Sequence, residues 1–436
     1  MKAAPEQAIE ALRQLPIPAL SKGFGSIAAT APVTTAQLVG RGRSLWTAGF
    51  EFPLLTLRES ALAHNVARMA EYCAGLGVLL CPHGKTAMSP QLAARQLAAG
   101  AWGITVASLD QLRVFRSFGF HRLLIANEIV DPAGIHWLAE ELQADESFEV
   151  YCFVDSPESV ALLDRELTDH QRGGGELRRR LPVLVELGYP GGRTGARGVP
   201  AAVKIAQAVT ATGTLRVAGV AGYEGSLDRV ATGSGAIEAV TGFCRELALL
   251  ATRLRENGLG TEEKLIVSAG GSGYFDIVAA ELTRSAEFTV LLRSGAYASH
   301  DDGHYQEVTP AARGSAGAPL FQPALELWAP VLSRPEPTLA ILGVGRRHAS
   351  FDAGLPIPKR LRAIGAGAST HLGTGWIITA LDDQHCYLQL PADAALSPGD
   401  LVGLGISHPC STFDKWRAIP VVDDADHLLD VAHTFF

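Results

Sequence analysis

Residues 78–86 read Val-Leu-Leu-Cys-Pro-His-Gly-Lys-Thr, an apolar run that ends abruptly in polar residues. An apolar run without alternating polar positions is typical of a parallel β-strand that is buried on both faces. Further runs of this kind follow along the chain. They span residues 103–107, 123–128, 149–155, 182–187, 216–223, 265–269 and 289–292. Together with the first run, they predict eight parallel strands.

Stretches with helical periodicity lie between these runs. Several of them begin near Ser, Asp or Pro and end at a glycine such as Gly100, Gly119 or Gly258, which are common start and stop residues of helices. Strands that alternate with helices in this way predict an α/β fold, and eight repeats predict a (β/α)8 TIM-type barrel. A doubly wound open sheet is the alternative fold.

The pattern changes after about residue 300, where helical periodicity nearly disappears. β-type runs at 338–344, 377–381 and 386–390 alternate with turns rich in Pro and Gly. This pattern predicts a second, mostly β C-terminal domain. Residues 1–50 resemble an extension that precedes the barrel.

The composition restricts the function classes. The chain has 436 residues, of which 47% are hydrophobic and 19% charged, which excludes a disordered chain. The net charge of −8 leaves no basic excess for a nucleic-acid partner. No apolar run approaches the ~20 residues that span a membrane, so we expect no membrane association. The six cysteines form no CxxC pair, which favours reduced thiols in a cytoplasmic protein.

In a barrel, the side chains that do chemistry gather at the carboxyl ends of the strands. Lys85 follows the first strand directly, with His83 two residues before it. Burial lowers the pKa of a lysine, and a neutral amine can form a Schiff base with a carbonyl group. Alternatively, Lys85 is a lysine that extends into solvent at the barrel rim.

A glycine-rich loop follows the seventh strand and precedes a predicted helix. It contains Gly271, Ser272, Gly273 and Tyr274. Glycines let backbone N–H groups approach an anion, and the following helix presents its positive end. A tight turn would explain this loop alone equally well. The loop and Lys85 together predict a site for pyridoxal 5'-phosphate.

His408 and Cys410 lie two residues apart in an extended part of the β domain, so their side chains project to the same side. Imidazole and thiolate are ligands that suit Zn²⁺. Two ligands are too few for a structural zinc site, so the pair predicts a catalytic metal site with open positions. The alternative is an ordinary buried cysteine beside a surface histidine.

At this point the chain resembles a known family, the D-serine dehydratase and D-threonine aldolase family of the alanine-racemase fold type. The stretches that carry the resemblance are 82–86, 97–105, 124–128, 223–225, 270–273 and 407–413. Many members of the family have an arginine and a second histidine where this chain has Cys81 and Ala87. That departure is similar to a bacterial branch described as D-serine or amino-acid deaminases.

The resemblance implies a site. Lys85 would bind pyridoxal phosphate covalently and His83 would assist it, while Arg193 or Tyr223 would face the pyridine ring. The loop at 271–274 would hold the phosphate. His408 and Cys410 would bind Zn²⁺ or another divalent metal. Aldolases of the family typically have aspartate in place of this cysteine, so Cys410 favours a dehydratase.

The resemblance also implies an organisation and a function. Residues 51–298 would form the cofactor-binding barrel, and 1–50 with 299–436 would form the β domain that carries the metal. The expected function is a carbon–oxygen lyase that converts a D-β-hydroxy amino acid, D-serine above all, to a 2-oxo acid and ammonia. The alternatives are a D-threonine aldolase, which releases glycine and an aldehyde, and a non-catalytic carrier of pyridoxal phosphate. The expected partners are a small-molecule substrate and a second copy in a homodimer.

Overall fold

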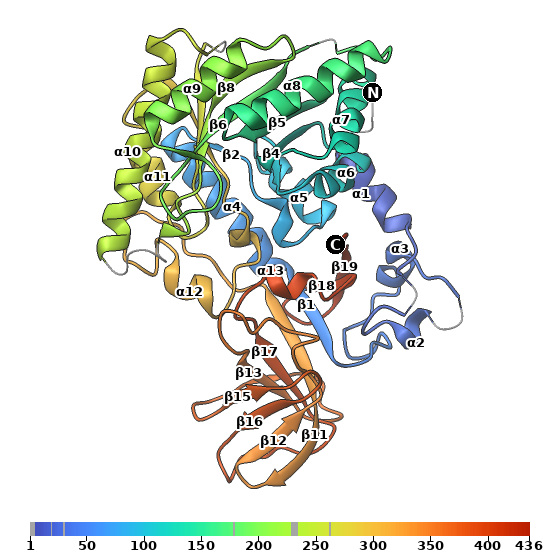
Figure 1. Ribbon diagram of the computed structural model, residues 1–436. Coiled ribbons are helices and arrows are strands. Elements are labelled where there is room, and N and C mark those ends of the chain that lie inside the picture. Colours follow the sequence, from blue (N-terminus) through green and yellow to red (C-terminus); the bar gives the residue numbers. More distant parts are fainter. Residues whose placement is uncertain (1–4, 19, 29–30, 178, 228–233, 261–262) are drawn as a thin grey trace.

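The computed structural model describes residues 1–436 apart from 1–4, 19, 29–30, 178, 228–233 and 261–262. All eight predicted barrel strands are present and pair in the order β2-β10-β9-β8-β6-β5-β4-β3 (Figure 1). Each pairing along this path is parallel. The strands are β2 (Leu79–Leu80), β3 (Ile104–Val106), β4 (Arg122–Glu128), β5 (Glu149–Val154), β6 (Leu181–Gly188), β8 (Leu215–Gly222), β9 (Leu265–Ala269) and β10 (Phe288–Leu292), and β7 (Ala196–Arg197) adds to β6.

The two ends of this sheet meet, which closes the barrel. A parallel bridge joins His83, just beyond β2, to Thr105 in β3. The N–H of Trp102 donates to the carbonyl of Leu80 over 2.7 Å, and the N–H of Thr105 donates to the carbonyl of Pro82 over 2.9 Å. These bonds exclude the doubly wound open sheet and confirm the (β/α)8 prediction. The closing seam ends at His83, immediately before the loop that carries Lys85.

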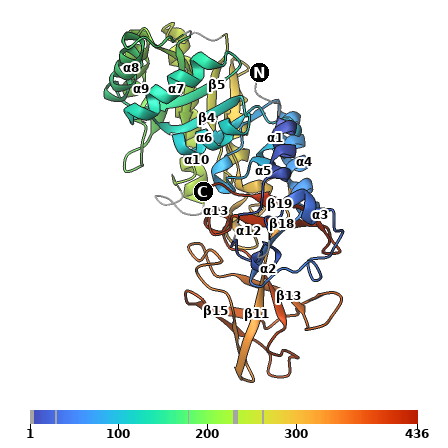
Figure 2. The same cartoon turned by 90° about the vertical axis from the view of Figure 1, so that its right-hand side faces the viewer.

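Helices cover the outside of the barrel, as Figures 1 and 2 show. Several start with proline in the first turn, where a missing N–H has no cost. The helices are α4 (Glu59–Leu76), α5 (Pro90–Ala98), α6 (Leu109–Ser117), α7 (Pro132–Ala144), α8 (Pro157–Arg172), α9 (Val199–Thr210), α10 (Ser234–Glu256) and α11 (Phe275–Leu282). In the part of the chain that the structure describes, no helix is long and apolar enough to cross a membrane.

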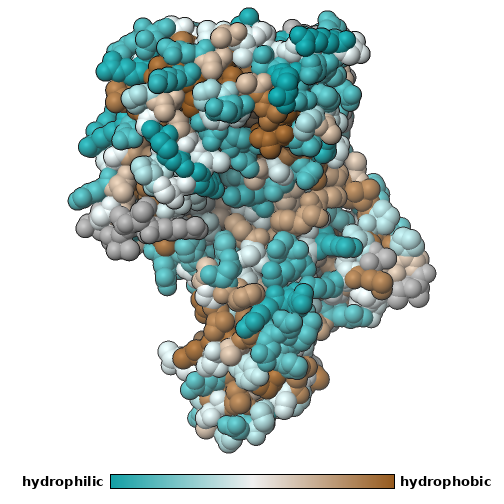
Figure 3. Space-filling view, viewed as in Figure 1, coloured by the Kyte–Doolittle hydropathy of each residue, from teal (hydrophilic) through white to brown (hydrophobic). Residues whose placement is uncertain are grey.

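The C-terminal part of the chain, from β11 onward, forms a mostly antiparallel sheet domain, as predicted, in the lower part of Figure 1. Its main path runs β14-β13-β17-β11-β1-β18-β19, and β12, β15 and β16 extend it. The strands are β11 (Leu325–Glu336), β12 (Leu339–Leu342), β13 (Ile357–Arg362), β14 (Thr370–His371), β15 (Ile377–Leu381), β16 (Cys386–Gln389), β17 (Leu401–Gly405), β18 (Ala418–Val422) and β19 (Leu428–His433). Figure 3 shows apolar side chains on the surface of this domain, where Leu332, Ile364 and Ile377 are exposed.

The N-terminal segment joins this sheet domain rather than the barrel. Strand β1 (Leu54–Arg58) falls inside the range expected for the barrel, but it pairs with β11 and β18. The helices before it are α1 (Pro5–Gln14), α2 (Gly25–Ala28) and α3 (Thr35–Val39). Helix α1 contacts α5, and α3 contacts β19, so the segment packs against both parts of the molecule.

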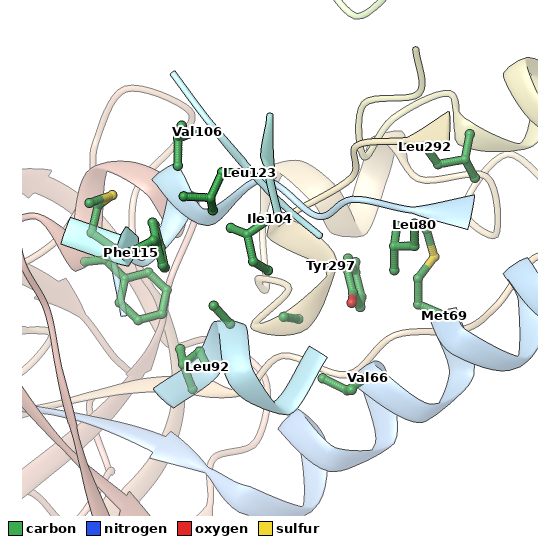
Figure 4. Close-up of a cluster of buried hydrophobic side chains, with 14 of the residues drawn as sticks. Val66, Met69, Leu80, Leu92, Ile104, Val106, Phe115, Leu123, Leu292 and Tyr297 are labelled. Atoms are coloured by element: carbon green, nitrogen blue, oxygen red, sulfur yellow. The ribbon is translucent and has the colours of Figure 1, made fainter. Parts of the chain in front are cut away.

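Two apolar cores hold the barrel. Outside the strands, Val66 and Met69 of α4 and Leu92 of α5 pack towards Leu80 and Ile104, as Figure 4 shows. Inside the barrel, alternate strand positions contribute a separate plug of side chains. Its members are Cys81, Leu124, Phe153, Leu184, Ala218, Ala221, Ile266 and Leu291. The plug closes the lumen, so polar groups can gather only above it, at the carboxyl ends of the strands.

The contact between β8 and β9 requires glycine at position 219. A Cβ atom there would lie 2.0 Å from the Ile266 carbonyl oxygen, a backbone atom that cannot move away cheaply. We predict that Gly219→Ala lowers the free energy of unfolding by about 3 kcal/mol, measured by denaturant unfolding. Gly242→Ala is the control, because that helical site has open space. The free energy of unfolding of Gly242→Ala should rise by about 0.5–1 kcal/mol. Equal stability of the two variants would contradict the close-approach argument.

Candidate active site

Lys85 lies in a short 3₁₀ turn, η1 (Gly84–Thr86), directly beyond β2. A Cβ atom on Gly84 would lie 2.6 Å from the Phe115 ring, so glycine lets this turn pack down on α6. The Lys85 side chain is reachable by solvent through the barrel mouth. Desolvation by the surrounding walls nevertheless lowers its pKa, with Arg193 adding to the effect and Cys410 opposing it. The amine is therefore prepared to act in its neutral form.

A cavity of about 180 Å³ opens at the barrel mouth around this lysine. Ten residues from the ends of several strands surround it. They are His83, Lys85, Ala107, Ala126, Asn127, Arg193, Thr194, Tyr223, Gly271 and Arg293. Five of these residues were expected at one site from the sequence, namely His83, Lys85, Arg193, Tyr223 and Gly271. Arg293 and Asn127 line the same cavity.

His83 forms the inner wall beside Lys85. Burial lowers the pKa of its imidazole well below the ordinary value, and the charges of Lys85 and Arg293 lower it further. Among the described residues, its Nδ1 atom has no hydrogen-bond partner. His83 is thus held as a neutral imidazole, which is a weak base and can serve Lys85 as an uncharged hydrogen-bonding neighbour.

Two arginines make the cavity strongly cationic. The Arg193 guanidinium stacks over the Tyr223 ring, with 4.3 Å from Cζ to the ring centroid. Arg293 is buried at the end of β10 and donates to Ser268 Oγ and to the Gly222 carbonyl, each over 2.6 Å. The sequence interpretation did not select Arg293, although its place at the end of the eighth strand was a usable signal.

The glycine loop lies at the cavity, but an internal carboxylate occupies part of it. Glu224 accepts hydrogen bonds from the N–H groups of Gly270, over 3.1 Å, and Gly271, over 2.6 Å. Ser272, Gly273 and Tyr274 then lead into α11, and the Arg313 guanidinium stacks over the Tyr274 ring at 4.8 Å. The segment left to receive an anion is therefore the residues that lead into α11, with its positive end behind them.

His408 and Cys410 approach the same mouth from the sheet domain of the same chain. Cys410 begins the short helix α13 (Cys410–Phe413), which Figure 1 shows at the junction of barrel and sheet. Its Sγ atom lies 3.4 Å from Oγ1 of Thr86, the residue next to Lys85. The barrel lysine and the candidate metal ligands therefore share one site within one chain.

The His408 ring is held by a carboxylate. Nδ1 of His408 lies 2.8 Å from Oδ2 of Asp352. Burial lowers the pKa of His408, but Cys410 and Asp352 outweigh burial and raise it to about 9. The described residues contain no group of three His, Cys, Asp or Glu side chains that could hold a metal. Any metal here would have two protein ligands and open positions for water or substrate.

Pyridoxal phosphate fits these residues. The site offers an amine of lowered pKa, a cavity lined by two arginines, an aromatic ring at Tyr223 and a helix N-terminus for an anion. The thiol and imidazole pair likewise offers the soft and borderline donors that zinc prefers. The residues therefore support both groups that the resemblance implies.

A second, larger cavity of about 370 Å³ lies where the sheet domain meets the start of α4. Its cations are already paired. Arg58 and Arg360 both contact Oε2 of Glu326, at 3.3 and 3.1 Å, and Lys359 contacts Oδ1 of Asp302 at 2.7 Å. With its charges satisfied internally, this cavity is a poorer candidate for chemistry than the barrel mouth.

Comparison with known families now decides the classification. A model of the alanine racemase N-terminal domain matches residues 57–274, half of the chain, and a model of a serine dehydratase domain matches residues 324–422. The chain belongs to the alanine racemase family. The second match, to a putative serine dehydratase domain, agrees with the resemblance to the D-serine dehydratase and D-threonine aldolase family.

Individual family members show the same relationship. D-threonine aldolase of Arthrobacter sp. is 27% identical over 373 residues, which cover 85% of this chain and 89% of the aldolase. D-threo-3-hydroxyaspartate dehydratase of Delftia sp. (strain HT23) is 31% identical over 180 residues, 40% of this chain and 43% of that enzyme. The crystal structure of D-threonine aldolase from Filomicrobium marinum superimposes with a TM-score of 0.73 at 25% identity, covering 89% of this chain and 96% of the aldolase.

Three carboxyl groups, those of Glu128, Asp155 and Glu186, interact near the carboxyl ends of β4, β5 and β6. Burial and the charges of Glu186 and Asp155 raise the pKa of Glu128 to about 8. Burial also raises the pKa of Glu186. A side-chain hydrogen bond to Glu186, which a protonated Glu128 would donate, raises the pKa of Glu128 as well. Glu128 therefore keeps its proton at neutral pH in the folded protein.

This raised pKa predicts how stability depends on pH. Above about pH 4.5 the unfolded chain releases the Glu128 proton while the folded chain keeps it up to about pH 8, so stability falls across this window. Glu128→Gln removes the loss. We compare the thermal midpoint of Glu128→Gln with that of the wild type at pH 4 and at pH 8. The advantage of the variant should be about 2–4 °C larger at pH 8. Glu71→Gln, on the exposed face of α4, is the control. A constant difference across the window would contradict this assignment.

Proposed function

We propose that the protein is a pyridoxal-phosphate- and metal-dependent lyase that removes the β-hydroxyl of a D-β-hydroxy amino acid and releases a 2-oxo acid and ammonia. D-Serine, which would yield pyruvate, is the proposed substrate. The observation that carries the proposal is the 3.4 Å approach of Cys410 Sγ to Thr86 Oγ1, beside Lys85. This approach supports the proposal, because it would set a metal-binding pair beside the amine of Lys85. The named relatives support the substrate class, because threonine and 3-hydroxyaspartate both carry a β-hydroxyl.

Lys85 and its neighbours would manage the proton at the substrate α-carbon. When bound, pyridoxal phosphate supplies an electron sink for negative charge at that carbon. Lys85 would hold the cofactor and then move the α-proton at Nζ, since desolvation by the cavity walls favours its neutral amine. His83, adjacent and held neutral by burial, would assist Lys85 as an uncharged hydrogen-bonding group, because its lowered pKa makes it a weak base. Arg193 and Tyr223 would orient the ring, and residues 272–274 would bind the phosphate.

His408 and Cys410 would act at the β-carbon. Hydroxide is a poor leaving group, and a divalent metal such as Zn²⁺ supplies a Lewis acid that improves it. In this chain, His408 through Nε2 and Cys410 through Sγ would hold the metal, because Nδ1 of His408 is engaged by Asp352. Their approach to Lys85 from the opposite domain would set the β-hydroxyl and the α-proton within reach of separate groups.

An aldolase is the second candidate, because a D-threonine aldolase matches 85% of this chain. It would break the bond between the α- and β-carbons and release glycine and an aldehyde. Cys410 favours the dehydratase, by the resemblance of this position to dehydratase members. Product analysis distinguishes the two reactions, and binding of the cofactor without turnover would favour the carrier protein.

The purified protein should therefore absorb as a lysine-bound pyridoxal phosphate enzyme and produce equal amounts of pyruvate and ammonia from D-serine. Lys85→Ala should lose the absorbance and at least about 10³-fold in kcat/KM. Lys204→Ala, on the outer helix α9, is the matched control and should behave as wild type. Glycine and an aldehyde from D-threonine, with no ammonia from D-serine, would overturn the dehydratase in favour of the aldolase.

Metal removal gives a separate test. Treatment with a chelator should lower kcat/KM for D-serine by about 10²-fold or more, and added Zn²⁺ should restore it. His408→Ala and Cys410→Ala should show the low value even with added metal. Full activity of either variant in the presence of chelator would show that the proposed metal plays no part.

We further propose a cytoplasmic homodimer. All six cysteines are free thiols in the structure, five of them buried, which supports a reducing compartment. The dimer rests on the resemblance alone, and its partner would not need to complete the lysine and metal site described above.

A further inference from the structure

The His408 side chain is part of a small network that extends beyond the candidate ligands. Its Nδ1–H donates to Oδ2 of Asp352 over 2.8 Å. The other carboxylate oxygen, Oδ1, accepts a 2.6 Å hydrogen bond from the Ser411 hydroxyl. Both oxygens of Asp352 are thus used to hold one short stretch of chain, residues 408–411.

The backbone around this network is fixed as well. The N–H of His408 donates to Ser350 Oγ over 3.1 Å, and the N–H of Ser350 donates to Thr412 Oγ1 over 3.1 Å. The Thr412 hydroxyl donates back to the His408 carbonyl over 3.0 Å. The segment that carries Asp352 and the turn that carries the candidate ligands therefore form one unit, although they lie 56 residues apart in the sequence.

This arrangement decides which ring nitrogen of His408 is left for a ligand. A carboxylate accepts hydrogen bonds but cannot donate them, so it requires the proton on Nδ1. In the neutral ring, which is the form that binds a metal, the lone pair then resides on Nε2. A neutral imidazole with a carboxylate behind it is the form that binds metal best, because the carboxylate fixes the ring and increases its basicity.

Asp352 itself is not a third ligand in this geometry. The described part of the chain holds no group of three His, Cys, Asp or Glu side chains positioned for one metal. Asp352 contacts His408 on the side of Nδ1, whereas a ligand to Nε2 would lie on the opposite side of the ring. Half of the Asp352 side chain is exposed, so it acts from the solvent side of the site.

We propose that Asp352, supported by Ser411, is a positioning residue that orients His408 and fixes its tautomer for metal binding. The proposal rests on the proposed function, because it requires a metal at His408 and Cys410. Asp352 lies outside every motif that the sequence showed. Its loss should weaken metal binding, and any fall in turnover would follow from that weaker binding.

The test measures metal affinity of the full-length holoenzyme by competition with a chromophoric zinc chelator. Asp352→Asn keeps the size of the side chain but loses its charge, and should bind Zn²⁺ about 10–100-fold more weakly than wild type. Ser411→Ala should show a smaller loss in the same direction, and Asp352→Glu should recover part of the affinity. Asp414→Asn, whose carboxylate pairs with the adjacent Lys415 at 3.2 Å, is the matched control and should bind as wild type.

Cobalt substitution separates positioning from general disruption. Co²⁺ bound to a thiolate has a charge-transfer absorption, so a retained band in Asp352→Asn at higher Co²⁺ concentration would show that Cys410 still binds while His408 is misplaced. Wild-type zinc affinity in both Asp352→Asn and Ser411→Ala, with affinity lost in His408→Ala, would overturn this inference and leave the proposed function standing. Absence of stoichiometric zinc in the wild-type protein would overturn both.

Discussion

The contact between the barrel and the sheet domain at Thr86 and Cys410 is the constraint on which the rest of the site depends. On the barrel side, the seam at His83 and Thr105 closes the ring and fixes where Lys85 emerges. On the other side, β17 leads into the turn that places His408 and Cys410. A displacement of about 1 Å at such a junction is enough to cost orders of magnitude in rate, because reacting groups must be aligned. In the proposed function, the two domains would therefore act as one catalytic unit.

The polar groups that lie above the apolar plug at the barrel mouth determine the protonation of the candidate site. Burial makes a charge costly, yet Lys85, Arg193 and Arg293 gather at the carboxyl end of the barrel. Each follows a different strand, and Glu186 and Glu224 act on Arg293 there. The apolar plug beneath them keeps the lumen closed. Desolvation consequently favours the neutral forms of Lys85 and His83, and neutral forms are the ones that accept protons. Glu128 lowers stability at neutral pH, because burial and the nearby carboxylates raise the pKa of its carboxyl group.

The sequence predicted the barrel well because its parallel strands are continuous apolar runs, and periodicity reports such runs directly. It predicted the sheet domain less completely. Strand β11 contains Pro330 and Pro335, and β1 finds its partners in β11 and β18, far along the chain, which no local pattern reveals. The candidate site divides in the same way. Lys85 and the His408–Cys410 pair stand in short motifs, whereas Asp352 and the hydrogen bonds of Glu224 to the glycine loop depend on tertiary contacts.

Subunit complementation tests most directly whether one chain holds the complete site. Lys85→Ala and Cys410→Ala chains would be expressed together in one cell and assayed on D-serine against each chain expressed alone. If the lysine and the metal ligands of one chain serve the same site, as the structure places them, every site carries one lesion and activity stays at the level of the separate variants. Recovery towards about a quarter of wild-type activity, the amount expected when half of the dimers are mixed and each has one intact site, would contradict the account.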